Sequence, residues 1–401
     1  MTGTGSLLHG LECRACCTAV PTDRPVGTCP TCGQALLATY DLAQLDRRRW
    51  PSEVASRPAT LWRYRELLPV ADPGHVTTLG EGFTPILPIA DSPQAPGVRL
   101  LLKDDGLNPT GSFKARGMAV AVSRAKELGL TELFVPSAGN AGVALSAYAA
   151  RAHLGARVYL PERTAPAIVD ACRSYGARVV TVPGTIREAG SAARARESSG
   201  GAFDMSTLRE PYRVEGKKTM GFEIWEQLAA EGLPDAIVYP TGGGTGLVGM
   251  YKAFAELREL ALIERIPRLI SIQPEGCAPV VRALREGAAR VTPWEDASTI
   301  APGLLVPSPF SSERVLEAIR ATRGAGATVS DRDLVDGMEE LARREGISVA
   351  PEGAAPWAAL GALVRQGAIR SGETVLLYNT GSGAGFVPAD LRRGLGPAPP
   401  G

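Results

Sequence analysis

The chain has 401 residues, 43 Lys plus Arg against 42 Asp plus Glu, and 44% hydrophobic residues, a composition typical of a folded protein of roughly two to three domains. A net charge of +1 without a basic or acidic block excludes nucleic acid and anionic membrane as expected partners and leaves a small molecule. Residues 1–10 lack the charged and apolar regions of a signal peptide, and the longest uncharged stretch, 133–150, is interrupted by Ser, Asn and Gly. These features predict a cytoplasmic protein.

Short β-branched runs alternate with longer helical patterns from about residue 98 onward, which is typical of α/β proteins with mostly parallel sheets. The expected buried strands are 98–103, 132–135, 157–160, 178–182, 236–239, 269–273 and 374–378. The expected helices are 113–128, 141–154, 166–175, 185–198, 215–231, 246–260, 312–322, 331–345 and 353–367. Because one sheet would be crowded by this many units, we expect two α/β domains with a ligand cleft between them.

Cysteines near the amino terminus form two pairs with the spacing of metal-binding knuckles. Cys13-x-x-Cys16 and Cys29-x-x-Cys32 are separated by twelve residues, so that four thiolates can close one tetrahedron. Four sulfur ligands leave no open position, which predicts a structural Zn²⁺ without a catalytic role. Iron in a rubredoxin-like site and buried thiols without metal are the alternatives. Cys17 has no assigned role.

The segment Asn108–Lys114 follows a predicted strand and opens a predicted helix. Pro109 and Gly111 make a turn, Ser112 is the expected N-cap, and Lys114 falls in the first helical turn. A cation there opposes the helix dipole, which favours the neutral amine and lowers the pKa of the lysine. The chain uses only six lysines against 37 arginines, and Lys114 is a candidate Schiff-base nucleophile. A surface lysine is the alternative interpretation of this segment alone.

Three further glycine-containing loops follow predicted strands. Ser137-Ala138-Gly139-Asn140-Ala141-Gly142 begins a helix whose backbone N–H groups suit a carboxylate, and its asparagine can offer an amide to a ring oxygen. Thr241-Gly242-Gly243-Gly244-Thr245-Gly246 lets bare backbone cradle a phosphate. Asn379-Thr380-Gly381 places a hydroxyl at a strand end. Each loop alone could be a tight turn, but together with the lysine they match pyridoxal 5'-phosphate carrying an amino acid.

These motifs resemble those of the fold-type II pyridoxal 5'-phosphate enzymes, and within them the threonine synthases. The resemblance covers nearly the whole chain and includes three further segments, 79–85, 211–219 and 351–353. It implies that Lys114 is catalytic and binds the cofactor covalently, that Asn140 contacts its phenolic oxygen, and that Thr380 meets its pyridine nitrogen. The cofactor phosphate is expected at Gly242, Gly243, Gly244, Thr245 and Gly246. Substrate contacts are expected from Ser137, Ala138, Gly139, Asn140, Ala141 and Arg213.

The resemblance implies two three-layer α/β domains with mostly parallel sheets around a cofactor cleft, plus a small amino-terminal zinc-ribbon-like unit. The expected boundaries are 1–40 for the four-cysteine unit, 41–120 plus 208–390 for a large cofactor-binding domain, 121–207 for a small α/β domain, and 391–401 for a tail. Because enzymes of this fold type are often dimers, a homodimer is expected by analogy.

The activity that the resemblance implies is a threonine synthase-type reaction, in which phosphate leaves Cγ of O-phosphohomoserine and water adds at Cβ. Five positions depart from the usual pattern of that family, so that the expected pocket for the leaving phosphate has fewer of the family's usual side chains. These positions are Ala115, Ala141, Leu208, Gly243 and Ala384. The alternative is therefore a β-eliminating or β-replacing enzyme, a threonine/serine dehydratase or a cysteate-synthase-like enzyme acting on serine derivatives.

Arg213 bears on that choice because a guanidinium matches phosphate oxygens, and Lys217 or Lys218 lies close to it in the sequence. The alternative is that Arg213 opens the following helix and pairs with an acid. A catalytically silent protein on the same fold is disfavoured because Lys114, Asn140 and Thr380 are all intact.

Overall fold

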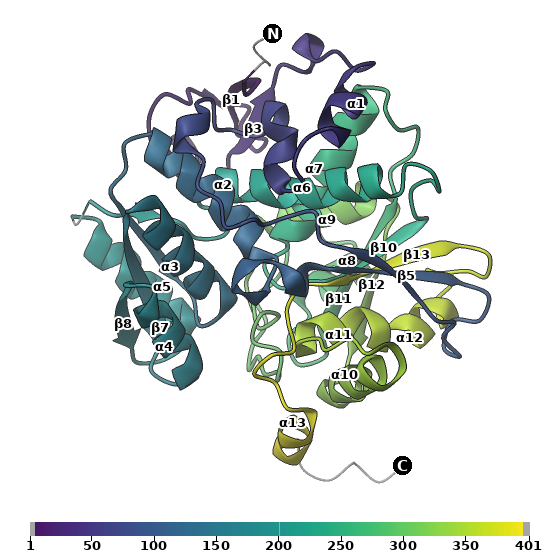
Figure 1. Ribbon diagram of the computed structural model, residues 1–401. Coiled ribbons are helices and arrows are strands. Elements are labelled where there is room, and N and C mark those ends of the chain that lie inside the picture. Colours follow the sequence, from purple (N-terminus) through teal and green to yellow (C-terminus); the bar gives the residue numbers. More distant parts are fainter. Residues whose placement is uncertain (1–4, 200, 396–401) are drawn as a thin grey trace. The chain divides into compact units, whose positions relative to one another are not determined.

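The computed structural model describes residues 5–199 and 201–395 (Figure 1). The chain divides into two compact units, each treated by itself below. As far as the structure describes these ranges, unit 1 comprises Met1–Phe83, Asn108–Glu226 and Lys252–Glu264, and unit 2 comprises Thr84–Leu107, Gln227–Tyr251 and Arg265–Gly401. The domain boundaries expected from the sequence divide the chain at other residues and stay a prediction. No helix among the described residues is long and apolar enough to cross a membrane.

Unit 1 begins with a small antiparallel sheet of order β2-β1-β3. Its strands are β1 (Leu8–Glu12), β2 (Ala19–Val20) and β3 (Leu37–Tyr40), followed by the short helix α1 (Trp50–Ala55). The two cysteine pairs lie in the connections between these strands. Leu11, Val20 and Ala38 are buried, so that this sheet contributes to the core of the unit.

The main sheet of unit 1 is parallel, with strand order β8-β7-β6-β9. Leu133 and Val158 on one face pack in the same core as the third helix, whereas Phe134 and Tyr159 on the other face pack with Ala193 of the fifth. Both faces are thus covered, as parallel sheets require. The elements are β6 (Glu132–Pro136), β7 (Gly155–Pro161), β8 (Arg178–Val182), β9 (Phe203–Asp204), α2 (Lys114–Glu127), α3 (Asn140–Ala152), α4 (Pro166–Ser174) and α5 (Ile186–Glu197).

Helix α6 (Tyr212–Gln227) crosses α2 with backbone against backbone. A Cβ added at Gly216 would overlap the carbonyl of Arg116 and would lie 2.8 Å from the Cα of Gly117. Beside this crossing the Arg116 guanidinium donates to both oxygens of Glu223, and both side chains are fully buried. The glycines allow the close approach, and the buried ion pair fixes it.

Unit 2 is built on a six-stranded sheet of order β12-β11-β10-β13-β5-β4. All neighbouring pairs are parallel except β4 and β5 at one edge. Val238 and Ile270 face a core shared with Trp357, and the alternate residues Ile237 and Leu269 are also fully buried. Its strands are β4 (Ile86–Ile89), β5 (Arg99–Asp104), β10 (Ala236–Pro240), β11 (Arg268–Pro274), β12 (Gly326–Val329) and β13 (Thr374–Asn379).

Helices cover this sheet, with α11 against β10, β11 and β13, and with α8 and α9 against β11. The helices after α6 are α7 (Thr245–Glu259), α8 (Pro279–Arg285), α9 (Ser312–Ala321), α10 (Asp331–Glu345), α11 (Pro351–Ala358), α12 (Leu360–Arg365) and α13 (Pro388–Gly394). Figure 1 shows α10, α11 and α12 grouped together beside the sheet.

The α/β class with mostly parallel sheets is confirmed, and every expected strand is present. The expectation that all of them are buried is wrong for β8, in which each residue is partly or fully exposed because it is an edge strand of its sheet. The helix expected over 353–367 is wrong in one respect: it is divided at Ala359 into α11 and α12. Sequence patterns missed the strands β1, β2, β3, β4, β9 and β12 and the helices α1, α8 and α13. Residues 391–394 of the expected tail end α13, and 396–401 lie outside the described residues.

Replacing Gly216 by Ala tests the helix crossing. Its Cβ would meet backbone that cannot turn away, so we expect the free energy of unfolding in urea to fall by about 1–3 kcal/mol, the usual cost of overpacking. Gly190 in α5 is the matched control, because its nearest neighbour is the flexible end of Arg194 at 3.3 Å. Gly190→Ala should be neutral or stabilising. Equal effects of the two substitutions would contradict the crossing.

Candidate active site

Lys114 is the first residue of α2 and is partly exposed. A 3-10 turn, η5 (Pro109–Gly111), precedes it, with Thr110 and Gly111 at positive φ angles of 61° and 69°. The expectation that Ser112 caps the helix is wrong: Phe113 is the N-cap and makes no side-chain cap bond. The hydroxyls of Thr110 and Ser112 are buried, and among the described residues they have no hydrogen-bond partner.

The loop from Ser137 to Gly142 leads from β6 into α3, which begins at Asn140. The N–H of Gly142 donates to Ser137 Oγ at 3.0 Å and to the carbonyl of Gly139 at 2.9 Å, which closes the loop into a compact turn. Residues 137–141 are partly exposed. The N–H groups of Asn140 and Ala141, at the first two positions of α3, have no acceptor within the helix, so the loop can offer backbone donors to an anion.

Arg213 is the second residue of α6 and is only 1% exposed. Its Nη1 donates to the carbonyl of Met205, while Nε and Nη2 have no hydrogen-bond partner among the described residues. The carboxylate of Glu210 does not pair with this guanidinium; it accepts from the N–H groups of Tyr212 and Arg213, both at 2.7 Å. Burial raises the pKa of Glu210 to about 7 and lowers the pKa of Arg213 to about 10. Arg213 does open the helix, but it forms no ion pair in the described chain.

Lys217 and Lys218 are neighbours on α6, and both are buried. Lys218 Nζ lies 2.7 Å from Glu215 and 2.9 Å from Glu256, so its charge is neutralised. Lys217 Nζ instead reaches only the carbonyl of Arg213, at 3.5 Å. Of the two lysines that the sequence placed near Arg213, the structure brings Lys217 to it.

The glycine loop of unit 2 runs from β10 into α7, which begins at Thr245. A Cβ at Gly242 would overlap the carbonyl of Gly303, and one at Gly246 would overlap the ring of Tyr239. Gly244 has a φ of 73° and faces Val315. Packing therefore requires these glycines, and the same packing leaves a loop of backbone without side chains at a helix N-terminus.

Thr380 follows β13 and is 5% exposed. The preceding Asn379 is held on two sides, because its Nδ2 donates to Asp104 at 2.7 Å and its Oδ1 accepts from Gly381 at 3.2 Å. Burial raises the pKa of Asp104. Since β10 and β13 are parallel neighbours, Thr380 and the glycine loop lie at the same edge of the sheet.

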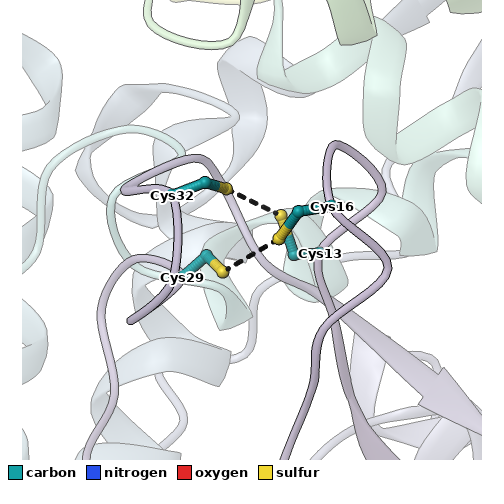
Figure 2. A group of neighbouring side chains, drawn as sticks. All are labelled: Cys13, Cys16, Cys29 and Cys32. Carbon is teal, nitrogen blue, oxygen red and sulfur yellow. Dashed lines mark hydrogen bonds between the residues drawn. The ribbon is translucent and has the colours of Figure 1, made fainter.

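The four expected metal ligands come together in unit 1 (Figure 2). The Sγ atoms of Cys13 and Cys32 are 3.4 Å apart, those of Cys16 and Cys29 are 3.6 Å apart, and all four lie within 4.8 Å of one another. Four thiolates around one Zn²⁺ would be separated by about 3.8 Å, given Zn–S bonds of about 2.3 Å. The cluster can thus hold a metal ion.

The two cysteine knuckles have the same backbone geometry, which assigns a place to Cys17. In the first knuckle Cys17 N–H donates to the carbonyl of Cys13, and in the second Gly33 N–H donates to the carbonyl of Cys29. Both residues are left-handed, with φ angles of 58° and 70°. Cys17 therefore occupies the turn position that glycine occupies in the other knuckle, and it is not one of the four clustered thiols.

The chain belongs to the family of pyridoxal-phosphate dependent enzymes, whose family model matches residues 77–381. Within that family it is similar to threonine synthases. It is 35% identical to threonine synthase of Methanosarcina acetivorans, over 93% of this chain and 91% of that protein. It is 33% identical to threonine synthase of Methanocaldococcus jannaschii, over 95% of this chain and 94% of that protein.

Solved structures agree with the fold. A threonine deaminase from T.th. superimposes with a TM-score of 0.61 and 30% identity, over 73% of this chain and 89% of that one. Maize serine racemase gives a TM-score of 0.67 at 19% identity, over 78% of this chain and 91% of that one. The expected family and its dependence on pyridoxal phosphate are thus confirmed, whereas the roles of the single site residues stay predictions.

Sequence reasoning missed several residues that shape the site. Glu210 holds the first N–H groups of α6, and an acid just before a helix was the available signal. Glu352 fixes the loop that packs on Gly242, since its Oε1 accepts from Gly303 N–H at 2.6 Å. The role of Asp104 could not be predicted from a local pattern, because its hydrogen-bond partner Asn379 is distant in the sequence.

Substitutions at Cys17 and Gly33 test whether these two residues occupy equivalent turn positions in the two cysteine knuckles. Cys17→Gly should raise the free energy of unfolding by about 1 kcal/mol, because a residue with a Cβ is disfavoured in that conformation, and Gly33→Ala should lower it by about as much. Denaturant unfolding of the metal-loaded protein measures both. Metal content should not change in either variant, and loss of metal in Cys17→Gly would make Cys17 a ligand.

Proposed function

We propose that the chain is a threonine synthase, which releases phosphate from O-phosphohomoserine and adds water at Cβ to give L-threonine. Similarity to proteins of that name over nearly their whole length supports this activity. The structural observation that carries it is Arg213, a buried guanidinium whose Nε and Nη2 lack partners in the described chain. A guanidinium fork suits a phosphate, and the phosphate distinguishes this substrate from serine and threonine.

The residues present fit pyridoxal 5'-phosphate. The glycine loop of 242–246 provides bare backbone at a helix N-terminus, and the hydroxyl of Thr380 lies at the same sheet edge. When bound, the cofactor supplies an electron sink for negative charge at the substrate Cα. We assign Lys114 to its covalent attachment, Asn140 to its phenolic oxygen and Thr380 to its pyridine nitrogen.

The chain's own groups divide the reaction between them. Backbone N–H groups at the start of α3, those of Asn140 and Ala141, hold the substrate carboxylate, and Arg213 holds the phosphate while it leaves Cγ. The Lys114 amine takes the proton from Cα and moves protons at Cβ, where water then adds. Water enters and phosphate leaves, so the atoms balance. Because Thr380 offers a neutral hydroxyl, the pyridine nitrogen is not kept protonated, which favours elimination and addition over transamination.

Product analysis tests this function. The cofactor-loaded protein should release phosphate from O-phospho-L-homoserine with an equal amount of threonine. Lys114→Ala should abolish the visible band of the covalently held cofactor and lower the rate by about 10²–10⁴-fold, the contribution of a positioned general acid and base. Lys126→Ala, at the far end of the same helix, is the control and should keep full activity. Unchanged turnover in Lys114→Ala would overturn the mechanism.

A second candidate is β-elimination or β-replacement on serine, threonine or phosphoserine. Two observations favour it: the apolar Leu208 is buried at a position where the resemblance led us to expect a hydroxyl, and the threonine deaminase from T.th. is 30% identical. Parallel assays with threonine, serine, and O-phosphoserine plus sulfite separate the two. An oxo acid or a replacement product, with no phosphate released from O-phosphohomoserine, would establish the second candidate.

For the four clustered cysteines we propose a structural Zn²⁺. Four thiolates favour zinc, and a closed tetrahedron gives it no open position for substrate. The knuckles lie in the connections of the small sheet, whose Leu11 and Val20 belong to the core of unit 1, so that the metal stabilises the packing of that sheet. The metal thereby contributes to folding and takes no part in the reaction.

Removing the metal tests this role. A chelator should lower the melting temperature, because an ion bound only by the folded state stabilises it by mass action. The visible spectrum of the bound cofactor should stay unchanged below the melting temperature. Metal analysis should find one zinc per chain. An unchanged melting temperature after the metal has been removed would contradict the structural role.

A further inference from the structure

Two adjacent lysines on α6 show how this fold treats buried charge. Lys218 is paired with Glu215 and Glu256, both within 3 Å. Lys217, 1% exposed, has no carboxylate within ion-pair distance among the described residues, and its only hydrogen bond there is the long one to the carbonyl of Arg213. In the described chain, therefore, Lys218 has carboxylate partners, whereas the adjacent Lys217 has none.

Arg213 is the second unpaired cation, four residues before Lys217 on the same helix face. It is buried, forms no ion pair in the described chain, and leaves Nε and Nη2 without acceptors. Isolated buried charges cost several kcal/mol each, and for that reason they are paired in folded proteins. Two of them on one face indicate an anion with two negative charges that is not part of the chain.

The position of Lys217 connects this pair of cations to Lys114. The ring centroid of Phe113 lies 4.0 Å from Lys114 Nζ and 5.7 Å from Lys217 Nζ. Lys217 Nζ also occupies the space left by Gly117, since a Cβ there would be 2.5 Å from it. The unpartnered hydroxyl of Ser112 lies on the same turn as Phe113. The anion site therefore borders the amine to which the chemistry is assigned.

We infer that Lys217 selects a doubly charged phosphate: with Arg213 it binds the dianion, and it takes up a proton as the dianion binds. The inference rests on the proposed function, which makes the leaving phosphate of the substrate the anion. The phosphate of the cofactor has the same chemistry, and the experiment below separates the two sources.

The proton uptake follows from the surroundings of Lys217. Burial, reinforced by the nearby Arg213 and Lys114, lowers the pKa of its ammonium well below the ordinary value, and Glu210 opposes this shift. A bound dianion raises the pKa of the Lys217 ammonium again, because a nearby opposite charge favours the protonated amine. In the cofactor-loaded enzyme Lys114 is covalently engaged, so that Arg213, Glu210 and the bound anion are the remaining charges. Glu210 can also take up a proton there, since its pKa is about 7.

The experiment uses the cofactor-loaded enzyme and inorganic phosphate as the probe. Calorimetry in buffers of different ionisation enthalpy measures both affinity and proton uptake above neutral pH. Lys217→Met should weaken phosphate binding about 10- to 100-fold, the value of a hydrogen bond to a charged group, and reduce the proton uptake. Lys217→Arg should keep binding but lose that uptake, because a guanidinium stays protonated. Glu210→Gln measures the contribution of the acid, and Lys126→Met is the control.

Stability provides a second measurement that does not depend on turnover. Without phosphate, Lys217→Met should be at least as stable as the parent, since it replaces a buried amine that has only one long hydrogen bond in the described chain by an apolar side chain. With phosphate, the parent should gain melting temperature and the variant should not. Lys126→Met should behave as the parent under both conditions.

The outcomes separate this inference from the proposed function. Unchanged phosphate affinity and proton uptake in Lys217→Met would overturn the inference, even if the enzyme makes threonine. Lower cofactor affinity with unchanged phosphate binding would assign Lys217 to the cofactor and overturn it as well. If phosphate binding depends on Lys217 but O-phosphohomoserine is not converted, the proposed function fails while the dianion site stands.

Discussion

The cost of burying charge is the constraint on which unit 1 depends. Helix α6 carries cations and acids into the interior, and the fold has to neutralise them there. Lys218 and Lys252 each pair with both Glu215 and Glu256, and the ring of Tyr40 lies 3.8 Å from Lys218 Nζ. Since Tyr40 ends β3, this cluster joins the small cysteine-bearing sheet to α6 and α7. Removing one of the four charges would leave a net charge buried in the cluster, and an uncompensated buried charge is strongly destabilising.

The second constraint is that some backbone segments lie very close together. Because this packing alone requires glycine, the glycine motifs are not by themselves evidence of cofactor binding. Gly216 is needed for α6 to pass α2, and Gly242, Gly244 and Gly246 are each pressed against a neighbouring group. Packing alone would therefore preserve these glycines. Their value for cofactor binding is a consequence of the same geometry, because a loop with no Cβ atoms leaves its N–H groups accessible at the start of α7.

The sequence was sufficient wherever a local pattern has one structural outcome. Buried parallel strands show as apolar runs, and the cysteine knuckles have a fixed spacing that brings four thiols together. It was insufficient where neighbours in the chain have different surroundings. Lys217 and Lys218 look equivalent in the sequence, but adjacent helical residues point about 100° apart, so one meets two acids and the other meets none among the described residues. The N-cap assigned to Ser112 was wrong by one residue, because α2 begins at Lys114 with Phe113 as its N-cap.

The departures from the usual family pattern can be understood from this arrangement of charge. Leu208 and Ala115, two of the positions at which the sequence departs from the expected pattern, are apolar and buried. Hydroxyl donors bind a phosphate in either ionisation state with similar strength, whereas a cation binds the dianion more strongly. The proposed site, in which Arg213 and Lys217 bind the phosphate, would therefore discriminate by charge. On the proposed function, a substrate that carries a phosphate gains an interaction with Arg213 and Lys217 that serine and threonine, which carry no second anion, do not gain.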